Sequence, residues 1–266
     1  MDKREMFDLR QQIGGEDPFG AMAQIRVDTY NQSRGEDDGT DIQCAECQNR
    51  GLTAFLNEEG QFAVRPCKCR GIRLTVKRLQ RQGLYEAAKK KTLPEFRTDT
   101  ESQRTLKTLV RQFIAEKEPR WMILCGQSGA GKTHLCTAAF VRLSIDKGLD
   151  GRYLVWNSDS RRIKATAKDG DDRMLNDFKQ CNLLYIDDLF KCKRDSEPSD
   201  ADVRLAFEIL DYRYSHKLTT IISSEMVLED IQYLDEAIYR RIREMCGPYI
   251  GNISRDPGKC YMPGSA

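Results

Sequence analysis

The sequence predicts an α/β protein in which a parallel sheet is flanked by helices, with a small cysteine-bearing module ahead of it. Three observations lead to this fold class. Apolar strand-length runs alternate with helical patterns from about residue 100 onward, an order that produces a parallel sheet covered by helices on both faces. A glycine-rich loop follows the first of these runs at 126–133, and four cysteines cluster at 44–69.

Composition excludes several classes of protein. The 266 residues are 39% hydrophobic and 32% charged, unlike collagen-like, low-complexity or coiled-coil chains. No apolar stretch approaches the ~18 residues of a membrane span, and the charged segment 1–10 is not the apolar core of a secretory signal. We therefore expect a cytoplasmic protein without membrane association. Its ten cysteines should be free thiols or metal ligands rather than disulfides.

Charge is unevenly distributed along the chain. Residues 1–41 carry ten acidic and five basic side chains, whereas residues 68–91 carry nine basic and one acidic. Within this basic block, Arg73, Lys77 and Arg81 recur at helical spacing and form a stripe on a helix predicted over 72–82. A block of one sign indicates an anionic partner. The stripe is expected to contact either DNA or a partner protein. Lys191, Lys193 and Arg194 form a second basic patch, which could follow the phosphates of DNA.

The predicted elements follow from hydrophobic patterning. In the cysteine module, 53–56 and 61–64 read as paired strands with a turn at 57–60. Apolar runs that are short and β-branched or aromatic predict the strands of the sheet; they lie at 121–125, 153–156, 183–186, 219–223 and 249–253. Helical spacing predicts the intervening helices, among them one from Gly131, one charged stretch to about residue 180, and helices over 201–216 and 228–246.

The segment 126–133 has the pattern of a phosphate-binding loop, G-x-x-x-x-G-K-T. Glycines let successive backbone N–H groups turn toward phosphate oxygens, and the helix that begins there adds its positive dipole end. The candidate nucleotide-binding residues are Gly126, Gln127, Ser128, Gly129, Ala130, Gly131, Lys132 and Thr133. Lys132 would reach the β and γ phosphates, and the Thr133 hydroxyl would bind Mg²⁺. The apolar strand before the loop and the helix after it are the context that this motif requires.

A pair of carboxylates ends the strand predicted at 183–186. Strands of a parallel sheet deliver ligand residues at their carboxyl ends, so Asp187 is expected to hold Mg²⁺ and Asp188 to polarise the attacking water. The strand predicted at 219–223 also ends in polar residues, and Ser224 or Glu225 could face the γ-phosphate or cap the next helix. ATP with Mg²⁺ is the expected ligand.

The four clustered cysteines have metal-ligand spacing. Cys44 and Cys47 form one close pair, and Cys67 and Cys69 form a second pair, with 19 residues between the two pairs. Two close pairs joined by a hairpin can supply the four thiolates of a structural zinc site, with glycines at 51 and 71 expected to permit tight turns after each pair. Iron–sulfur ligation and plain buried thiols are the alternatives. Without metal, a segment with so few apolar residues would hardly fold.

Several blocks together resemble the DnaC/DnaI-type replicative helicase loaders, which are AAA+ ATPases, and especially their phage and mobile-element forms. The blocks are GQSGAGKTHLCTA, NLLYIDDLFK, FEILDYRYSHKLTTIISSE and LDEAIYRRIREMC, and the cysteine module also fits this group. The resemblance implies an AAA+ P-loop fold with a reduced lid and a zinc module that contacts the helicase. It also implies a slow, partner-stimulated ATPase that places a DnaB-type helicase on single-stranded DNA and self-associates with ATP.

The resemblance also implies roles for individual residues. Lys132 and Thr133 are the Walker A residues, and Asp187 and Asp188 are the Walker B pair. Glu225, or Ser224 beside it, falls at the sensor 1 position. Arg241 falls at the arginine finger, which would act on the nucleotide of a neighbouring subunit.

Four segments are predicted in chain order. They are an acidic, partly helical segment and linker at 1–41, the zinc module at 42–71, a basic helix and linker at 72–98, and the AAA+ ATPase domain at 99–266. Two other functions fit the nucleotide motifs: an IstB-type transposition helper ATPase and a small-molecule P-loop kinase. The cysteine module favours the loader, because it supplies a separate partner-docking domain that a small kinase would not need.

Overall fold

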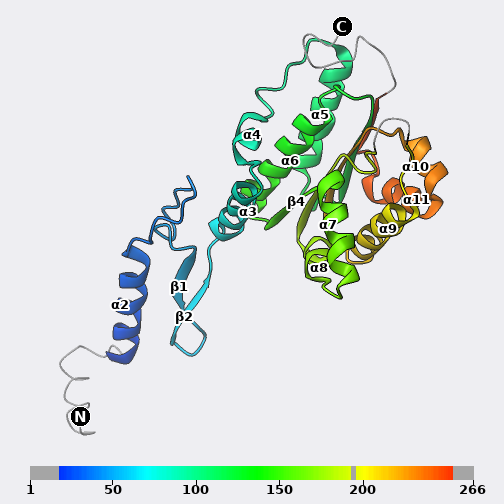
Figure 1. The fold of residues 1–266 in the computed structure, drawn as a ribbon. Coiled ribbons are helices and arrows are strands. Elements are labelled where there is room, and N and C mark those ends of the chain that lie inside the picture. Colours follow the sequence, from blue (N-terminus) through cyan, green and yellow to red (C-terminus); the bar gives the residue numbers. More distant parts are fainter. Residues whose placement is uncertain (1–17, 193–195, 254–266) are drawn as a thin grey trace. The chain divides into compact units, whose positions relative to one another are not determined.

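The computed structural model describes residues 18–192 and 196–253 (Figure 1). The chain divides into two compact units, Met1–Arg73 and Leu74–Ala266. The division falls within helix α3 (Cys69–Arg81). Among the described residues, no helix combines the length and the apolar character needed to cross a bilayer.

The first unit is built from a helix and a two-stranded antiparallel hairpin. Its elements are α2 (Pro18–Gln32), β1 (Leu52–Leu56), β2 (Phe62–Pro66) and the start of α3. The hairpin turn is closed by a hydrogen bond from Gly60 N to Asn57 O at 2.9 Å, as the sequence predicts. The Asn31 side chain joins α2 to the hairpin, since it donates to Ala54 O at 3.0 Å and accepts from Ala54 N at 2.8 Å.

The second unit contains a five-stranded parallel sheet with the strand order β4-β5-β6-β3-β7. The strands are β3 (Trp121–Gly126), β4 (Gly151–Val155), β5 (Leu183–Asp187), β6 (Thr219–Ser224) and β7 (Ile250–Ile253). This arrangement confirms the parallel sheet that the alternating pattern predicts. The phosphate loop follows β3, an internal strand, and the carboxylate pair lies at the carboxyl end of β5, which is separated from β3 only by β6.

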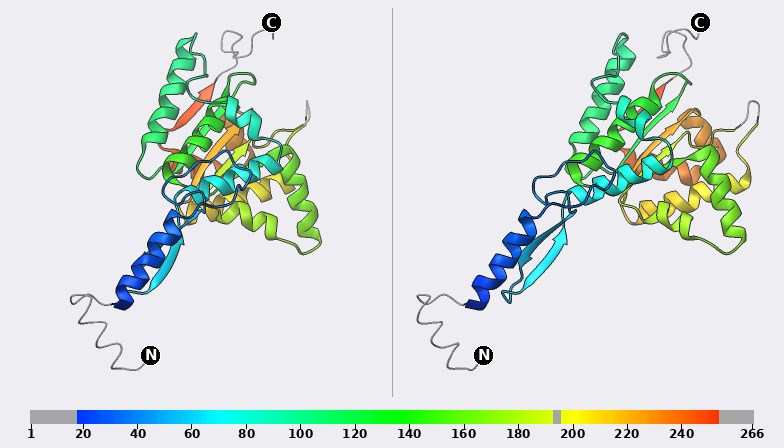
Figure 2. Two further views of the ribbon diagram at one scale, coloured as in Figure 1. Left: turned by 90° about the vertical axis from the view of Figure 1, so that its left-hand side faces the viewer. Right: turned by 60° about the vertical axis from the view of Figure 1, so that its left-hand side comes forward.

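Helices cover both faces of this sheet (Figures 1 and 2). The helices are α4 (Tyr85–Lys90), α5 (Glu101–Ala115), α6 (Lys132–Lys147), α7 (Trp156–Lys168), α8 (Arg173–Gln180), α9 (Asp200–Ser215), α10 (Leu228–Leu234) and α11 (Glu236–Cys246). One hydrophobic core lies between the sheet and α5 and α6, and the other lies between the sheet and α7 to α11. Strand β3 serves both: Trp121 and Ile123 face the second core, and Met122 and Leu124 face the first. Burial on both faces explains why this strand is apolar throughout.

Three predicted boundaries are wrong. Trp156, predicted to end a strand, opens α7, because the Asp159 carboxylate accepts a hydrogen bond from Val155 N at 2.9 Å and so caps the start of the helix. The charged stretch to residue 180 is two helices, α7 and α8, with Gly170 at φ +75° between them. Helix α3 starts at Cys69, so Gly71 lies inside a helix rather than in a turn.

Candidate functional site

The loop at 126–131 connects the carboxyl end of β3 to the amino end of α6, and its conformation requires glycine. Gly126 has φ +102°, and a Cβ atom there would collide with the carbonyl oxygen of Ile253. Gly131, at φ +86°, is the residue that precedes the first turn of α6. Side chains other than glycine rarely adopt this left-handed region. The positive end of the α6 dipole therefore faces the loop, an arrangement that favours phosphate.

The Lys132 side chain is folded against this loop. Its ammonium donates to Gly126 O at 2.8 Å and to Gln127 O at 2.6 Å, and the residue is only 5% exposed. Burial lowers the pKa of Lys132, and the charges of Asp188 and Glu225 oppose that shift. The cation is thus held at the loop by two carbonyl dipoles.

Asp187 is surrounded by four hydroxyl donors. Its Oδ1 accepts from Thr133 Oγ1 at 3.1 Å, Ser223 Oγ at 2.7 Å and the Tyr185 hydroxyl at 2.6 Å. Its Oδ2 accepts from the Tyr153 hydroxyl at 2.8 Å. The hydrogen bond between Thr133 and Asp187 joins the two residues predicted to hold Mg²⁺, although they are 54 positions apart. Hydroxyl and carboxylate oxygens suit this hard cation, so the donor set fits magnesium.

A second network joins the ends of β5 and β6 to the phosphate loop. Lys191 donates to Asp188 Oδ2 at 2.8 Å and to Glu225 Oε1 at 2.9 Å, and Glu225 Oε1 also accepts from Ser128 Oγ at 2.9 Å. Burial raises the pKa of Asp188, although the hydrogen bond from Lys191 partly offsets it. Burial would also raise the pKa of Glu225, but the hydrogen bonds from Lys191 and Ser128 outweigh it and lower that pKa.

These groups open onto one cavity of about 460 Å³. Its lining residues are Lys91, Arg97, Ser128, Gly129, Gly131, Lys132, Thr133, His134, Asp188, Lys191 and Glu225. The structure therefore brings together the loop, Asp188 and Glu225, as the sequence predicts. Gly126, Gln127 and Ala130 belong to the loop without lining the cavity, and Asp187 is reached from it through Thr133. Ser224 is fully buried and donates to Leu189 O at 2.8 Å, so Glu225 is the residue of that pair that faces the cavity.

Several residues around this site were missed by sequence reasoning. Tyr153 and Tyr185 occupy paired positions in β4 and β5, which is why both hydroxyls reach the same carboxylate. Lys191, taken from the sequence as part of a basic patch, is instead paired inside the cavity. Lys193 and Arg194, the other members of that patch, lie outside the described residues. The one signal in the sequence is that both tyrosines lie within apolar strand-length runs, where a buried hydroxyl requires a hydrogen-bond partner.

Arg241 lies in α11 and is held within its own chain. Its Nε and Nη2 donate to Asp211 Oδ1 at 2.9 and 2.5 Å, and its Nη1 donates to Ala237 O at 3.0 Å. Its guanidinium also lies over the ring of Phe207, 4.8 Å from the centroid. Arg241 does not line the nucleotide cavity of this chain. Its action on a neighbouring subunit stays a prediction.

The four cysteines of the first unit converge. Their sulfur atoms all lie within 4.8 Å of one another, with Cys44 and Cys67 at 3.7 Å and Cys47 and Cys69 at 3.4 Å. Tetrahedral zinc with Zn–S bonds of about 2.3 Å would place sulfurs about 3.8 Å apart. Gly51 N also donates to Cys47 Sγ at 3.3 Å. The donor set and its spacing fit a structural zinc ion.

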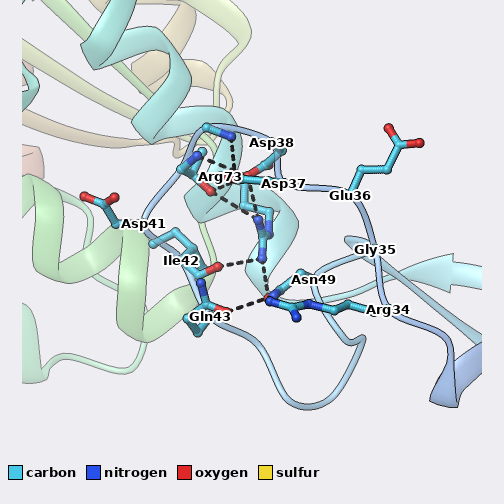
Figure 3. Close-up of a pocket in the computed structure, with 12 residues that line it drawn as sticks. Arg34, Gly35, Glu36, Asp37, Asp38, Asp41, Ile42, Gln43, Asn49 and Arg73 are labelled. Atoms are coloured by element: carbon cyan, nitrogen blue, oxygen red, sulfur yellow. Dashed lines mark hydrogen bonds and ion pairs between the residues drawn. The ribbon is translucent and has the colours of Figure 1, made fainter.

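Arg73 is not part of an exposed basic stripe, which corrects the sequence interpretation. It is only 6% exposed and points into the acidic loop at 34–43 (Figure 3). It donates to Asp38 Oδ1, Thr40 Oγ1, Ile42 O and Asn49 Oδ1 at 2.8 to 3.1 Å. The Asn49 side chain in turn accepts from Cys44 N at 2.8 Å. Arg73 therefore ties the loop to the cysteine cluster, and its charge serves the fold of this unit.

The sequence matches a known protein family over most of its length. A family model described as IstB-like ATP binding protein matches residues 69–240, well over half of the chain. The chain belongs to this family of IstB-like ATP-binding proteins. The match begins at the last cysteine of the cluster and ends one residue before Arg241. It therefore covers the phosphate loop, both aspartates and Glu225, and leaves three of the four cysteines outside it.

Two relatives of this IstB-like protein come from Bacillus subtilis (strain 168). The phage-like element PBSX protein XkdC is 28% identical over 228 residues, covering 81% of this chain and 84% of the relative. The uncharacterized protein YqaM is 34% identical over 146 residues, covering 54% of this chain and 46% of the relative.

Solved structures share the fold. A crystal structure of the DnaC helicase loader is similar with a TM-score of 0.54 and 24% identity, over 64% of this chain and 97% of that chain. The replication initiator DnaA bound to AMPPCP and single-stranded DNA is similar with a TM-score of 0.51 and 21% identity, over 63% of this chain and 50% of that chain. The second unit of the IstB-like protein thus has the AAA+ P-loop NTPase fold, which confirms the expected fold class.

Proposed function

We infer that this IstB-like protein is an ATP-dependent loader, which places a DnaB-type replicative helicase on single-stranded DNA and uses ATP hydrolysis as its switch. The observation that carries the proposal is the cavity in which the phosphate loop, Thr133 with Asp187, and Asp188 meet, in a chain that also carries a separate four-cysteine unit. The similarity to the DnaC helicase loader also supports the loader function. The phage-like element relative supports a phage or mobile-element origin.

The residues of the cavity are suited to hydrolysis of ATP. Lys132 would bind oxygens of the β and γ phosphates, and Mg²⁺ held by Thr133 and Asp187 would neutralise charge that develops during phosphoryl transfer. Asp188 would orient a water molecule and accept its proton, as the new bond forms to the γ-phosphorus and the bond to the β-phosphate oxygen breaks. Glu225 would position the loop through Ser128. Arg241 would complete the site from a neighbouring copy after ATP-dependent self-association.

The first unit would serve as the docking module for the helicase. Zinc bound by Cys44, Cys47, Cys67 and Cys69 would hold its fold together, and its role would be structural because four thiolates leave no open coordination position. The separate core of this unit supports such a division of labour.

A pull-down tests the loader proposal. The full chain is immobilised and offered the replicative helicase of the host with ATPγS, with ADP and without nucleotide. We expect retention to depend on the nucleotide, and this dependence to disappear in Lys132→Ala. Arg142→Ala, at an exposed position that pairs with Asp146 in the same helix, is the matched control. A helicase ignored in every state would refute the proposal.

The second candidate is an IstB-type transposition helper, favoured by the description of the matching family model. The same pull-down separates the two functions when a DNA transposase of the host element replaces the helicase. Retention of the transposase with ATPγS, together with indifference to the helicase, would favour the transposition helper.

A further inference from the structure

The turn after β5 brings Lys191 back over Asp188. Lys191 N donates to Asp188 O at 2.9 Å, and both Asp188 and Phe190 adopt positive φ, +59° and +63°. A bulky residue rarely takes this left-handed conformation. Here the Phe190 ring is 2% exposed and packs edge-on against Trp156, with centroids 5.6 Å apart, and Leu189 N donates to Ser223 O at 2.8 Å. Core packing and a backbone hydrogen bond therefore hold Lys191 at the mouth of the cavity.

Lys191 connects three elements that would surround a bound nucleotide. Its ammonium lies 2.8 Å from Asp188 at the end of β5 and 2.9 Å from Glu225 after β6, and Glu225 accepts from Ser128 of the phosphate loop at 2.9 Å. The Lys191 side chain is 37% exposed, so a ligand in the cavity can reach it. One cation thus joins both strand ends to the loop.

The charges of this cavity give Lys191 a specific importance. Asp188 and Glu225 face the cavity in which a nucleoside triphosphate would bind. Where water is partly excluded, these two carboxylates would strongly repel the phosphate oxygens of that nucleotide. In phosphate loops the backbone binds the first two phosphates, and the third extends toward the lysine and the carboxylates at the strand ends. Lys191 lies between those carboxylates, so it is a second cation, besides Lys132, that is placed to meet the third phosphate.

We propose that Lys191 is a positioning residue that distinguishes triphosphate from diphosphate, a role that presupposes the ATP site proposed above. A γ-phosphate oxygen replaces Glu225 as the partner of the Lys191 ammonium. Glu225 is then released from Lys191, and its hydrogen bond with Ser128 is free to rearrange. ADP lacks the third phosphate and leaves the bridge from Asp188 to Glu225 in place. The state of the terminal phosphate is thereby transmitted from the end of β5 to the end of β6.

Calorimetry with Mg-ATPγS and Mg-ADP tests this role in the full chain. Lys191→Met keeps the length of the side chain and removes its charge. We expect its affinity for ATPγS to fall roughly tenfold or more, as for loss of a hydrogen bond between charged groups, with ADP affinity changed by less than about twofold. Lys191→Arg should restore much of the preference for ATPγS. Lys168→Met, on the exposed end of α7 and outside the cavity, is the matched control.

The outcomes separate this role from the ATP site itself. If Lys191→Met weakens the binding of both nucleotides equally, or of neither, the positioning role is wrong while the ATP site stands. If the unmodified chain binds neither nucleotide, the ATP site and the role of Lys191 fall together. Lys191→Gln provides a second uncharged variant should the methionine variant not fold. The same comparison of its affinities for ATPγS and ADP with those of the unmodified chain decides the question.

Discussion

Tyr185→Phe is the substitution that tests most directly how the fold supports the magnesium site. The Tyr185 side chain is fully buried, and its ring packs against Tyr153 with centroids 4.5 Å apart. Its hydroxyl donates to Asp187 at 2.6 Å and lies 3.2 Å from Ser223 Oγ. Burial raises the pKa of Tyr185 well above its usual value, so the hydroxyl remains a donor at any working pH. Phenylalanine keeps the ring and deletes only this donor.

The expected magnitude follows from the remaining donors. A hydrogen bond to a charged group contributes about 1.5–3 kcal/mol. Asp187 would keep three donors, from Thr133, Ser223 and Tyr153, so its carboxylate is not left unpaired. We therefore expect the free energy of unfolding of the second unit to fall by about 1.5 kcal/mol, the lower end of that range. Because a supporting contact to a metal ligand is lost, the affinity for Mg²⁺ with nucleotide should fall about tenfold.

Tryptophan fluorescence during urea unfolding measures the first quantity. The chain has two tryptophans, Trp121 and Trp156, and both are buried in the second unit, so the signal reports that unit alone. Titration of Mg²⁺ into the complex with a fluorescent ATP analogue measures the second. Tyr214→Phe is the matched control, since it keeps the half-buried ring and removes a solvent-exposed hydroxyl–carboxylate hydrogen bond to Glu244, and it should change neither quantity.

Two results would refute this reasoning. An unchanged unfolding midpoint in Tyr185→Phe would mean that the hydroxyl does not stabilise the carboxylate. Lower stability with unchanged Mg²⁺ affinity would mean that the hydroxyl supports the core and not the metal site.

Four further predictions concern other parts of the chain. Lys132→Ala should abolish measurable ATP binding while tryptophan fluorescence stays native; undiminished affinity by calorimetry would reject the phosphate-loop assignment. Metal analysis should find about one zinc per chain. The Cys67→Ser variant should lose the zinc, and only its first unit should become protease-sensitive. A metal-free chain whose first unit resists protease would exclude the zinc site. Arg241→Ala should lower ATPase activity only at concentrations where chains assemble; equal loss in isolated monomers would argue against action on a neighbour. Because burial raises the pKa of Asp188 and the ionised form is needed to accept a proton, kcat/KM should fall with decreasing pH at a higher pH than for an ordinary aspartate; a rate independent of pH over the acidic range would contradict this role.

Local sequence patterns were sufficient for much of the site. The apolar run at 121–125 followed by G-x-x-x-x-G-K-T specifies a strand, a tight loop and a helix within a few residues, and the structure has all three. The spacing of Cys44, Cys47, Cys67 and Cys69 likewise predicted a cluster that the structure forms. In both cases the residues that act together are close in the chain or joined by one hairpin.

Helical spacing alone misled the interpretation of the basic residues. Arg73 repeats with Lys77 and Arg81 at a period that suggests one exposed face, yet Arg73 is buried by a loop that lies more than 30 positions earlier. Lys191 was similarly expected to belong to a patch that follows DNA phosphates, but a strained turn directs it to Asp188 and Glu225. A charged side chain does not reveal its partner when that partner is distant in the chain.

The amino-acid sequence by itself determined the parallel sheet, the phosphate loop, the aspartate pair and the four-thiolate cluster, because each depends on short-range periodicity or spacing. Only the tertiary structure decided which hydroxyls hold Asp187 and which carboxylates Lys191 joins. Those contacts bring together the ends of strands separated by 30 or more residues. Their geometry follows from how the strands are ordered and aligned in the sheet, which no local pattern in the chain encodes.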